Sequence, residues 1–142
     1  MYYIDTSVLV AYYCQEDLSE QVQDFLSEQV KPAISTLTEV ELFSAIARKV
    51  RMGDLDQADG NRIVSKFLSH MDCNLFSIIP VESHHWRVAR GWIGLFNTSL
   101  RTLDALHLAI ASVGDFVLVT SDQRLIQAAD TLGVKVRVIN FN

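Results

Sequence analysis

The sequence predicts one α/β domain in which a parallel β-sheet is flanked by helices on both faces, and three observations support this fold class. Short runs rich in β-branched and aromatic residues alternate along the chain with segments whose apolar residues recur at helical spacing. That alternation is typical of a parallel sheet buried between helices. The chain has 142 residues, of which 49% are hydrophobic, and this suffices for one core. Because no linker rich in Pro, Gly or Ser divides it, we expect a single domain over residues 1–142.

The first half of the chain is expected to hold two strands, each followed by two helices. The run 1–4 is aromatic and β-branched, and Asp5, Thr6 and Ser7 then offer side chains that cap a helix. Gly53 marks the end of a later helix, since glycine readily adopts the conformation that closes helices. We expect a strand over 1–4, a helix that begins at these capping residues and continues through 8–13, and a helix over 17–30. After them we expect a strand over 32–35, a helix capped by Thr36 or Thr38 and ended by Gly53, and a helix from about Asp54.

The second half continues the alternation with three strands. The run 116–119 is wholly apolar, as expected of a strand that is buried on both faces. The expected elements, in order, are a strand over 74–79, helices over 82–96 and 102–113, a strand over 116–119, a helix over 122–132 and a strand over 134–139.

Composition and charge narrow the class of protein. No apolar run approaches the roughly 18 residues that cross a bilayer, and Asp5 interrupts the apolar N-terminus, so we expect neither a membrane span nor a signal peptide. Cys14 and Cys73 lack the spacing of a metal or redox motif, which favours reduced thiols and a cytoplasmic location. The 12 basic and 17 acidic residues give a net charge of −5. This charge argues against a general nucleic-acid coat protein, but not against an enzyme that gathers carboxylates around a cation.

Four acidic residues stand where the chemistry of such a fold is expected. In parallel α/β sheets the binding crevice lies beyond the carboxyl ends of the strands. Asp5 follows the first strand, Asp122 follows the strand over 116–119, and Asp104 and Glu41 lie in helices among apolar neighbours. Taken singly, the three aspartates are typical of helix caps or partners of the helix dipole, and Glu41 is typical of a solvated helix residue.

Taken together, these acids favour a metal site. A buried carboxylate must pair with a cation, take up a proton or bind a metal. The cations that lie near them in sequence are few, namely Arg101 beside Asp104 and Arg124 beside Asp122. Oxygen ligands favour Mg²⁺ or Mn²⁺ over Zn²⁺, which prefers His and Cys.

Four segments resemble the motifs of PIN-domain proteins, in the order typical of that family. They are 3–10 (YIDTSVLV), 35–42 (STLTEVEL), 102–109 (TLDALHLA) and 119–125 (VTSDQRL). Within the family the chain is most similar to the VapC-type toxins of bacterial toxin–antitoxin pairs. The resemblance implies a PIN-like, Rossmann-like fold and a Mg²⁺- or Mn²⁺-dependent endoribonuclease, which hydrolyses RNA phosphodiester bonds with a metal-activated water. It also implies a VapB-like antitoxin as partner, and a homodimer.

The resemblance assigns roles to individual residues. Matched position by position, the catalytic acids are Asp5, Glu41, Asp104 and Asp122, and the metal ligands are the three aspartates. The hydroxyl residues that brace these carboxylates are Thr6, Ser7 and Thr120. Glu39 is a neighbouring acid, but two residues along a helix correspond to about 200°, so only one of the pair faces the groove. The pattern of the family selects Glu41.

Other residues have both a functional and a structural interpretation. Arg48, Arg101 and Arg124 are candidates for contacts with RNA phosphates, although solvated arginines on a helix look the same in sequence. His107 follows Asp104 by three residues, the spacing of a metal-binding acid–histidine pair, but a packed and hydrogen-bonded histidine is commoner.

The acidic stripe, defined as Asp17, Glu20, Asp24 and Glu28, recurs at helical spacing. It is either a solvated helix face or a docking surface for a partner with basic residues. Three function classes stay open at this point: a toxin ribonuclease, a PIN-domain nuclease in RNA processing or decay, and a non-catalytic module that binds RNA or protein and uses its carboxylates only as caps.

Overall fold

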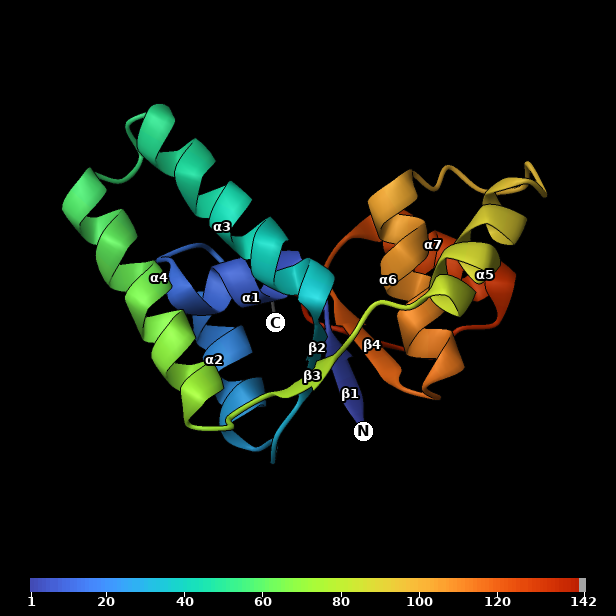
Figure 1. Ribbon diagram of the computed structural model, residues 1–142, viewed down its shortest axis with the longest axis horizontal. Helices are drawn as coiled ribbons and strands as arrows, with labels where there is room; N and C mark the ends of the chain where they lie inside the picture. Colours follow the sequence, from blue (N-terminus) through green and yellow to red (C-terminus); the bar gives the residue numbers. More distant parts are fainter. Residues whose placement is uncertain (141–142) are drawn as a thin grey trace.

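A computed structural model describes residues 1–140 of the protein. At its centre is a five-stranded parallel sheet in the order β3-β2-β1-β4-β5 (Figure 1). The strands are β1 (Tyr2–Ile4), β2 (Ala33–Ser35), β3 (Ser77–Ile79), β4 (Val117–Thr120) and β5 (Val136–Val138). The helices are α1 (Thr6–Tyr13), α2 (Ser19–Ser27), α3 (Thr36–Arg51), α4 (Gln57–Asp72), α5 (Ser83–Ile93), α6 (Thr102–Val113) and α7 (Gln123–Leu132). Helices α1–α4 cover one face of the sheet and α5–α7 cover the other, which confirms the predicted fold class (Figure 1).

Alternating side chains of the central strands build the two cores. Tyr3 of β1 pairs in register with Ala33 of β2 and Leu118 of β4, and all three are buried against α5–α7. The residues that follow them along the strands pack against α1–α4, namely Ile4, Ile34 and Val119. Because successive strand residues face opposite sides of a sheet, these short strands contribute apolar side chains to both cores.

Strand β1 is the point from which the chain builds the sheet in both directions. It lies between β2 and β4, so the connections after β1 lead to one side and those that reach β4 and β5 lead to the other. Such a reversal opens a crevice at the carboxyl ends of the two neighbouring strands. Asp5 directly follows β1, and its backbone N–H donates to the carbonyl of Val119 in β4 at 3.0 Å. The residues after β1 and after β4 therefore meet at one edge of the sheet.

Several expected boundaries move by a few residues because of local hydrogen bonds. Strand β3 begins at Ser77 rather than at residue 74, since the N–H groups of Asn74 and Leu75 donate back to α4 and close that helix. Strand β5 begins at Val136 because the N–H of Val134 donates to Ala129 at the end of α7.

The helices show similar differences at their ends. The cap of α3 is Ser35 rather than Thr36 or Thr38, and the Thr38 hydroxyl accepts in return from the Ser35 N–H. Helix α2 covers only the middle of the expected range 17–30, and α5 ends at Ile93 rather than at residue 96. Within residues 1–140 no helix is both long and apolar enough to cross a membrane.

Candidate active site

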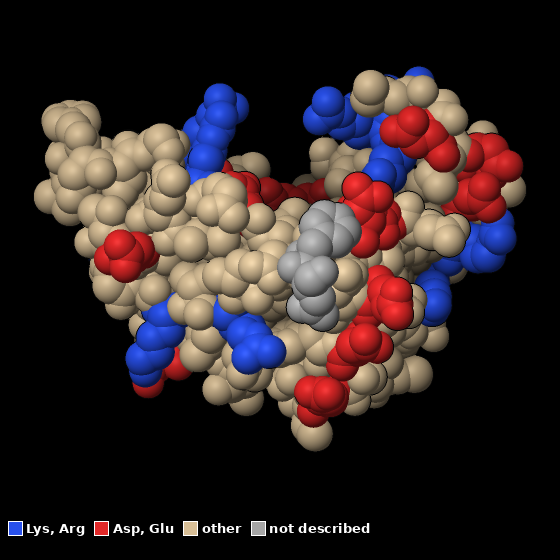
Figure 2. Space-filling model, turned by 180° about the vertical axis from the view of Figure 1, so that it is seen from behind, with Lys and Arg blue, Asp and Glu red and all other residues tan. Residues whose placement is uncertain are grey.

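A groove lies at the edge of the sheet where β1 and β4 end. It has a volume of about 660 Å³ and is lined mainly by α1, α3 and the loop after α3, with Leu103 of α6 on the far side. Figure 2 shows this hollow at the top of the molecule, with Asp and Glu side chains on its floor and Lys and Arg side chains on both rims. The groove is therefore acidic inside and basic at its edges.

Asp5, which directly precedes the groove residues Thr6 and Ser7, is held by two hydroxyl groups. It is buried, and its Oδ2 accepts from Ser7 Oγ at 2.6 Å and from Thr120 Oγ1 at 3.0 Å. Although Asp5 occupies the N-cap position of α1, its side chain makes no capping hydrogen bond. The interpretation of Asp5 as a helix cap is therefore wrong, whereas Ser7 and Thr120 do contact its carboxylate.

Asp122 is a true helix cap that lies beside the same hydroxyl. Its Oδ1 accepts from the backbone N–H of Arg124 at 2.8 Å and caps α7. Its own N–H donates to Thr120 Oγ1 at 3.0 Å. A single threonine hydroxyl thus connects Asp122 to Asp5.

Asp104 shows that the acids repel one another. It lies in the first turn of α6 and is partly buried. Burial raises the pKa of the Asp104 carboxyl above its ordinary value, and the charges of Asp5 and Asp122 raise it further. Glu41 also raises this pKa, whereas His107 lowers it. The other three predicted acids consequently lie within electrostatic reach of Asp104.

This set of acids fits a hard divalent cation. No ion pair among residues 1–140 involves Asp5, Asp104 or Asp122, so their charges are not balanced by a lysine or arginine. Among the same residues no three or more His, Cys, Asp or Glu side chains are grouped closely enough to hold a metal ion, so the three aspartates do not form a complete ligand set. Unbalanced oxygen ligands of this kind suit Mg²⁺ or Mn²⁺.

Glu41 reaches the groove from α3 and is fixed by two donors. Its Oε1 accepts from Thr6 Oγ1 at 2.7 Å and also from His107 Nε2. Burial alone raises the pKa of Glu41, but the hydrogen bonds and charge of His107 and the Thr6 hydroxyl outweigh it, so that the pKa is lowered overall. Glu41 lines the groove and Glu39 is not among its lining residues, as the helical spacing predicted.

His107 is the residue whose place in the site the sequence did not reveal. It is buried and hydrogen-bonded, which confirms the structural interpretation over a metal ligand paired with Asp104. Its bond to Glu41 nevertheless ties it to the groove. The signal in the sequence was its position one helical turn after Asp104, which places both side chains on the same face of α6.

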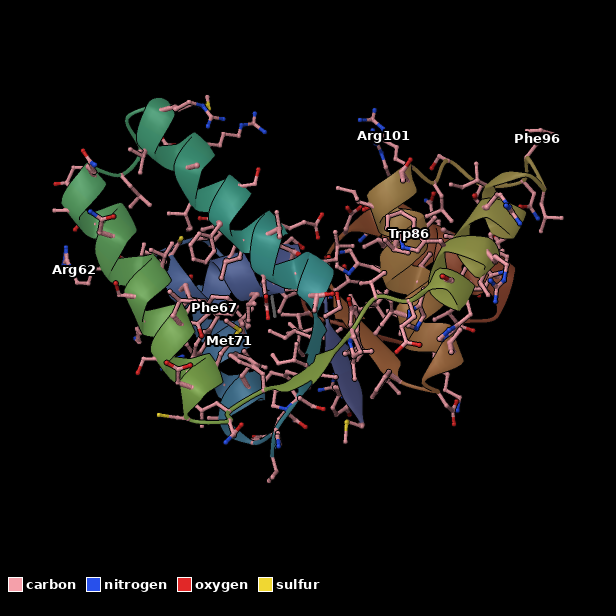
Figure 3. The ribbon with its side chains drawn as sticks, viewed as in Figure 1. Arg62, Phe67, Met71, Trp86, Phe96 and Arg101 are labelled. Atoms are coloured by element: carbon pink, nitrogen blue, oxygen red, sulfur yellow. The ribbon has the colours of Figure 1, made fainter. Side chains whose placement is uncertain are left out.

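The candidate arginines take different positions. Arg48 of α3 lines the groove, and Arg101, which precedes α6, is exposed at the opposite rim (Figure 3). Arg124 is exposed on α7 and does not line the groove; its backbone, not its guanidinium, contacts Asp122. Two of the three candidates therefore flank the acidic floor.

A parallel α/β fold with acids at one edge of its sheet defines a class of α/β proteins with a candidate metal site. Comparisons with known proteins identify the family. The family model of the PIN domain matches residues 2–131, and the chain belongs to the PIN-domain family. It is 35% identical to Ribonuclease VapC35 of Mycobacterium tuberculosis, over 96% of this chain and 95% of that protein. It is also 31% identical to Ribonuclease VapC46 of the same organism, over 94% of each chain.

Solved structures support the same fold. VapBC2 from Rickettsia felis, bound to a DNA fragment from the promoter of its genes, aligns with a TM-score of 0.71 over 98% of both chains at 15% identity. FitAcB from Neisseria gonorrhoeae aligns with a TM-score of 0.72 over 96% of both chains at 20% identity. The solved structures confirm the fold, and the family model together with the two relatives confirms the resemblance to the PIN-domain family and its VapC-type members.

Proposed function

We propose that this protein is a Mg²⁺- or Mn²⁺-dependent endoribonuclease and the toxin of a VapBC-type pair. The observation that carries the proposal is that Asp5, Asp104 and Asp122 have no ion-pair partner among residues 1–140, and that burial and the charges of Asp5 and Asp122 raise the pKa of Asp104. Acids placed this way cost stability unless a cation binds among them. The names of the VapC relatives supply the substrate class, RNA.

The three aspartates would hold the cation, and other residues keep them in place. When bound, Mg²⁺ or Mn²⁺ lowers the pKa of water and neutralises charge that develops on the phosphate. Thr120 braces Asp5 and receives the N–H of Asp122, so it keeps two of the ligands at a constant separation. Glu41, kept ionised by its two donors, accepts a hydrogen bond from the attacking water and orients it.

The rims of the groove are suited to a nucleic-acid backbone. Arg48 and Arg101 lie on opposite sides of the acidic floor, where their guanidinium groups bind phosphates on either side of the scissile bond. Such contacts orient the strand without reading its sequence.

The acidic stripe is proposed as part of the surface that binds a basic segment of a VapB-like antitoxin. Asp17, Glu20, Asp24 and Glu28 are all exposed, and α2 carries two of them. We also propose a cytoplasmic homodimer, for which the half-exposed Trp86 of α5 is available as an apolar contact (Figure 3).

Cleavage of total cellular RNA tests the proposal. The antitoxin-free protein is incubated with RNA and Mn²⁺, and parallel reactions contain EDTA. We expect discrete fragments with Mn²⁺ and intact RNA with EDTA. Intact RNA in the presence of folded, Mn²⁺-loaded protein would contradict the nuclease and favour a binding module.

Two glutamates of α3 provide a matched pair of variants. Glu41→Gln removes the charge of the groove acid, whereas Glu39→Gln removes the same charge two residues earlier on the same helix. We expect E41Q to lose cleavage and E39Q to keep it. The inverse result would overturn the choice of acid. Growth arrest upon expression in bacteria, abolished by E41Q, separates a toxin from a processing nuclease.

A further inference from the structure

Tyr3, His107 and Glu41 form a chain of hydrogen bonds from the core to the groove. Tyr3 is 0% exposed and His107 is 1% exposed. The phenol oxygen of Tyr3 lies 2.6 Å from His107 Nδ1, and the other ring nitrogen, Nε2, bonds to Glu41 Oε1. The three residues come from β1, α6 and α3, so the chain connects the centre of the sheet to two helices beside the groove.

The protons of this chain follow from the chemistry of its members. Hydrogen bonds from His107 and Thr6 lower the pKa of Glu41 against the effect of burial, so its carboxylate is ionised at neutral pH and can only accept. Nε2 of His107 must therefore carry a hydrogen. A phenol carries its proton at neutral pH, and the Tyr3 oxygen lies 2.8 Å from Ser35 Oγ and 2.6 Å from Nδ1. The imidazole is thus held through both of its nitrogens.

Only one oxygen of Glu41 is engaged by this arrangement. Oε1 accepts both from His107 and from Thr6, while Oε2 has no hydrogen-bond partner among residues 1–140. The Glu41 side chain is 22% exposed and lines the groove, whereas that of His107 is 2% exposed. The two donors consequently fix the rotation of the carboxylate and leave Oε2 for the groove.

Apolar side chains at positions 3 and 107 would fill the same space without the cost of burying two polar rings. Burial of an imidazole and a phenol is tolerated only when their polar atoms are bonded. Of the hydrogen bonds made by the two rings, those of His107 to Glu41 and Thr6 lead to the groove. The buried pair therefore contacts the groove through Thr6 of α1 and Glu41 of α3.

We infer that His107, oriented by Tyr3, is a positioning residue that holds Glu41 with one carboxylate oxygen facing the groove. The inference rests on the proposed nuclease function and assigns to that site a residue that touches neither substrate nor metal. Outer residues that orient a catalytic group typically contribute 10- to 100-fold to activity.

Two substitutions of His107 separate positioning from packing. The amide nitrogen of glutamine reaches the place of Nε2, so His107→Gln keeps a donor to Glu41. The amide of asparagine reaches only the place of Nδ1, so His107→Asn keeps the contact with Tyr3 and loses the one with Glu41. We expect H107N to lower kcat by roughly 10- to 100-fold with little change in KM, and H107Q to recover at least about 10-fold of that loss.

The possible results distinguish a failure of this inference from a failure of the proposed nuclease function. Equal kcat values for H107N and H107Q, with a cleaving wild-type protein, would overturn the positioning role. If H107N does not fold, Tyr3→Phe leaves His107 in place and removes the phenol hydroxyl, with its contacts to His107 and Ser35. It is expected to lower kcat in the same direction, and an unchanged kcat would overturn the role of Tyr3.

Nitrogen NMR of the His107 ring gives a readout that does not depend on cleavage. We expect a protonated Nε2 whose resonance shifts when Glu41 is replaced by alanine. An unprotonated Nε2, or a resonance indifferent to Glu41, would overturn the inference. A wild-type protein that fails to cleave RNA would contradict the proposed function alone. The NMR result would still show whether His107 Nε2 donates to Glu41.

Discussion

Replacement of Asp104 by asparagine should make the protein more stable and inactive at once. Asp104 is partly buried, and its pKa is raised by burial and by the charges of Asp5 and Asp122. Asparagine keeps the shape and removes the charge. Because the charge is removed, we expect D104N to raise the free energy of unfolding in metal-free buffer by about 0.5–2 kcal/mol, the range typical of a single stabilising substitution. That gain corresponds to a Tm increase of roughly 2–8 °C.

The pH dependence gives the sign of the effect. Since the pKa of Asp104 is raised in the folded protein, the folded state binds the proton more tightly than the unfolded state. The wild-type protein therefore loses stability as the pH rises from the unfolded-state pKa, about 3.9, through the raised folded-state pKa. The advantage of D104N should be present at neutral pH and vanish in acid, below both pKa values.

Thermal denaturation in EDTA at neutral and acidic pH measures this difference, and RNA cleavage is measured in parallel. Addition of Mn²⁺ should stabilise the wild-type protein, by about 2.7 kcal/mol at 100 times its Kd, and D104N by less. Asp130→Asn is the control, because Asp130 is an exposed carboxylate of α7 that does not line the groove. A D104N protein that is less stable than wild type at neutral pH, or that still cleaves RNA, would reduce Asp104 to a partner of the helix dipole.

Three further changes test other parts of the molecule. Arg48→Ala should raise KM for RNA about 10-fold with kcat nearly unchanged in initial-rate assays, and an unaltered KM would remove this groove wall from RNA binding. Charge reversal at Glu20 and Asp24 should weaken calorimetric binding of a basic antitoxin by at least about 10-fold, and unchanged affinity would assign the stripe to solvent. Phe67→Ala empties a fully buried position on α4 and should cost about 3–5 kcal/mol in urea unfolding; a loss under about 1 kcal/mol would show that the α4 helix contributes little to the core.

The sequence predicted best those elements whose ends are marked by local chemistry. The expected helix over 102–113 has the bounds of α6, and Gly114 follows it as the C-cap. Strands β3 and β5 were shorter than expected, because backbone groups just before them are used to close the preceding helices. Hydrophobic runs do not reveal which backbone groups a neighbouring helix will take, so strand ends were the weakest part of the prediction.

The site was predictable to the extent that topology determines position. Asp5 and Asp122 follow adjacent parallel strands, so any sheet with this order brings them to one edge. The contacts of His107 were beyond such reasoning, since its partners Tyr3 and Glu41 are 104 and 66 residues away in sequence. Periodicity assigns a residue to a face of its own helix, but it does not identify the side chain on the element packed against that face.

The distribution of charge, rather than its sum, reconciles an acidic protein with a polyanionic substrate. The net charge of −5 determines the sign of the field far from the molecule, and on that basis RNA would be repelled. Near the groove the acids lie on the floor and the basic side chains on the rims (Figure 2). In the proposed nuclease, a divalent cation on the floor would cancel this repulsion where a phosphate approaches, while Arg48 and Arg101 would attract the backbone from the two rims. The proposal therefore predicts that RNA binding depends on the metal, since without a cation the same carboxylates would oppose the substrate that the rims attract.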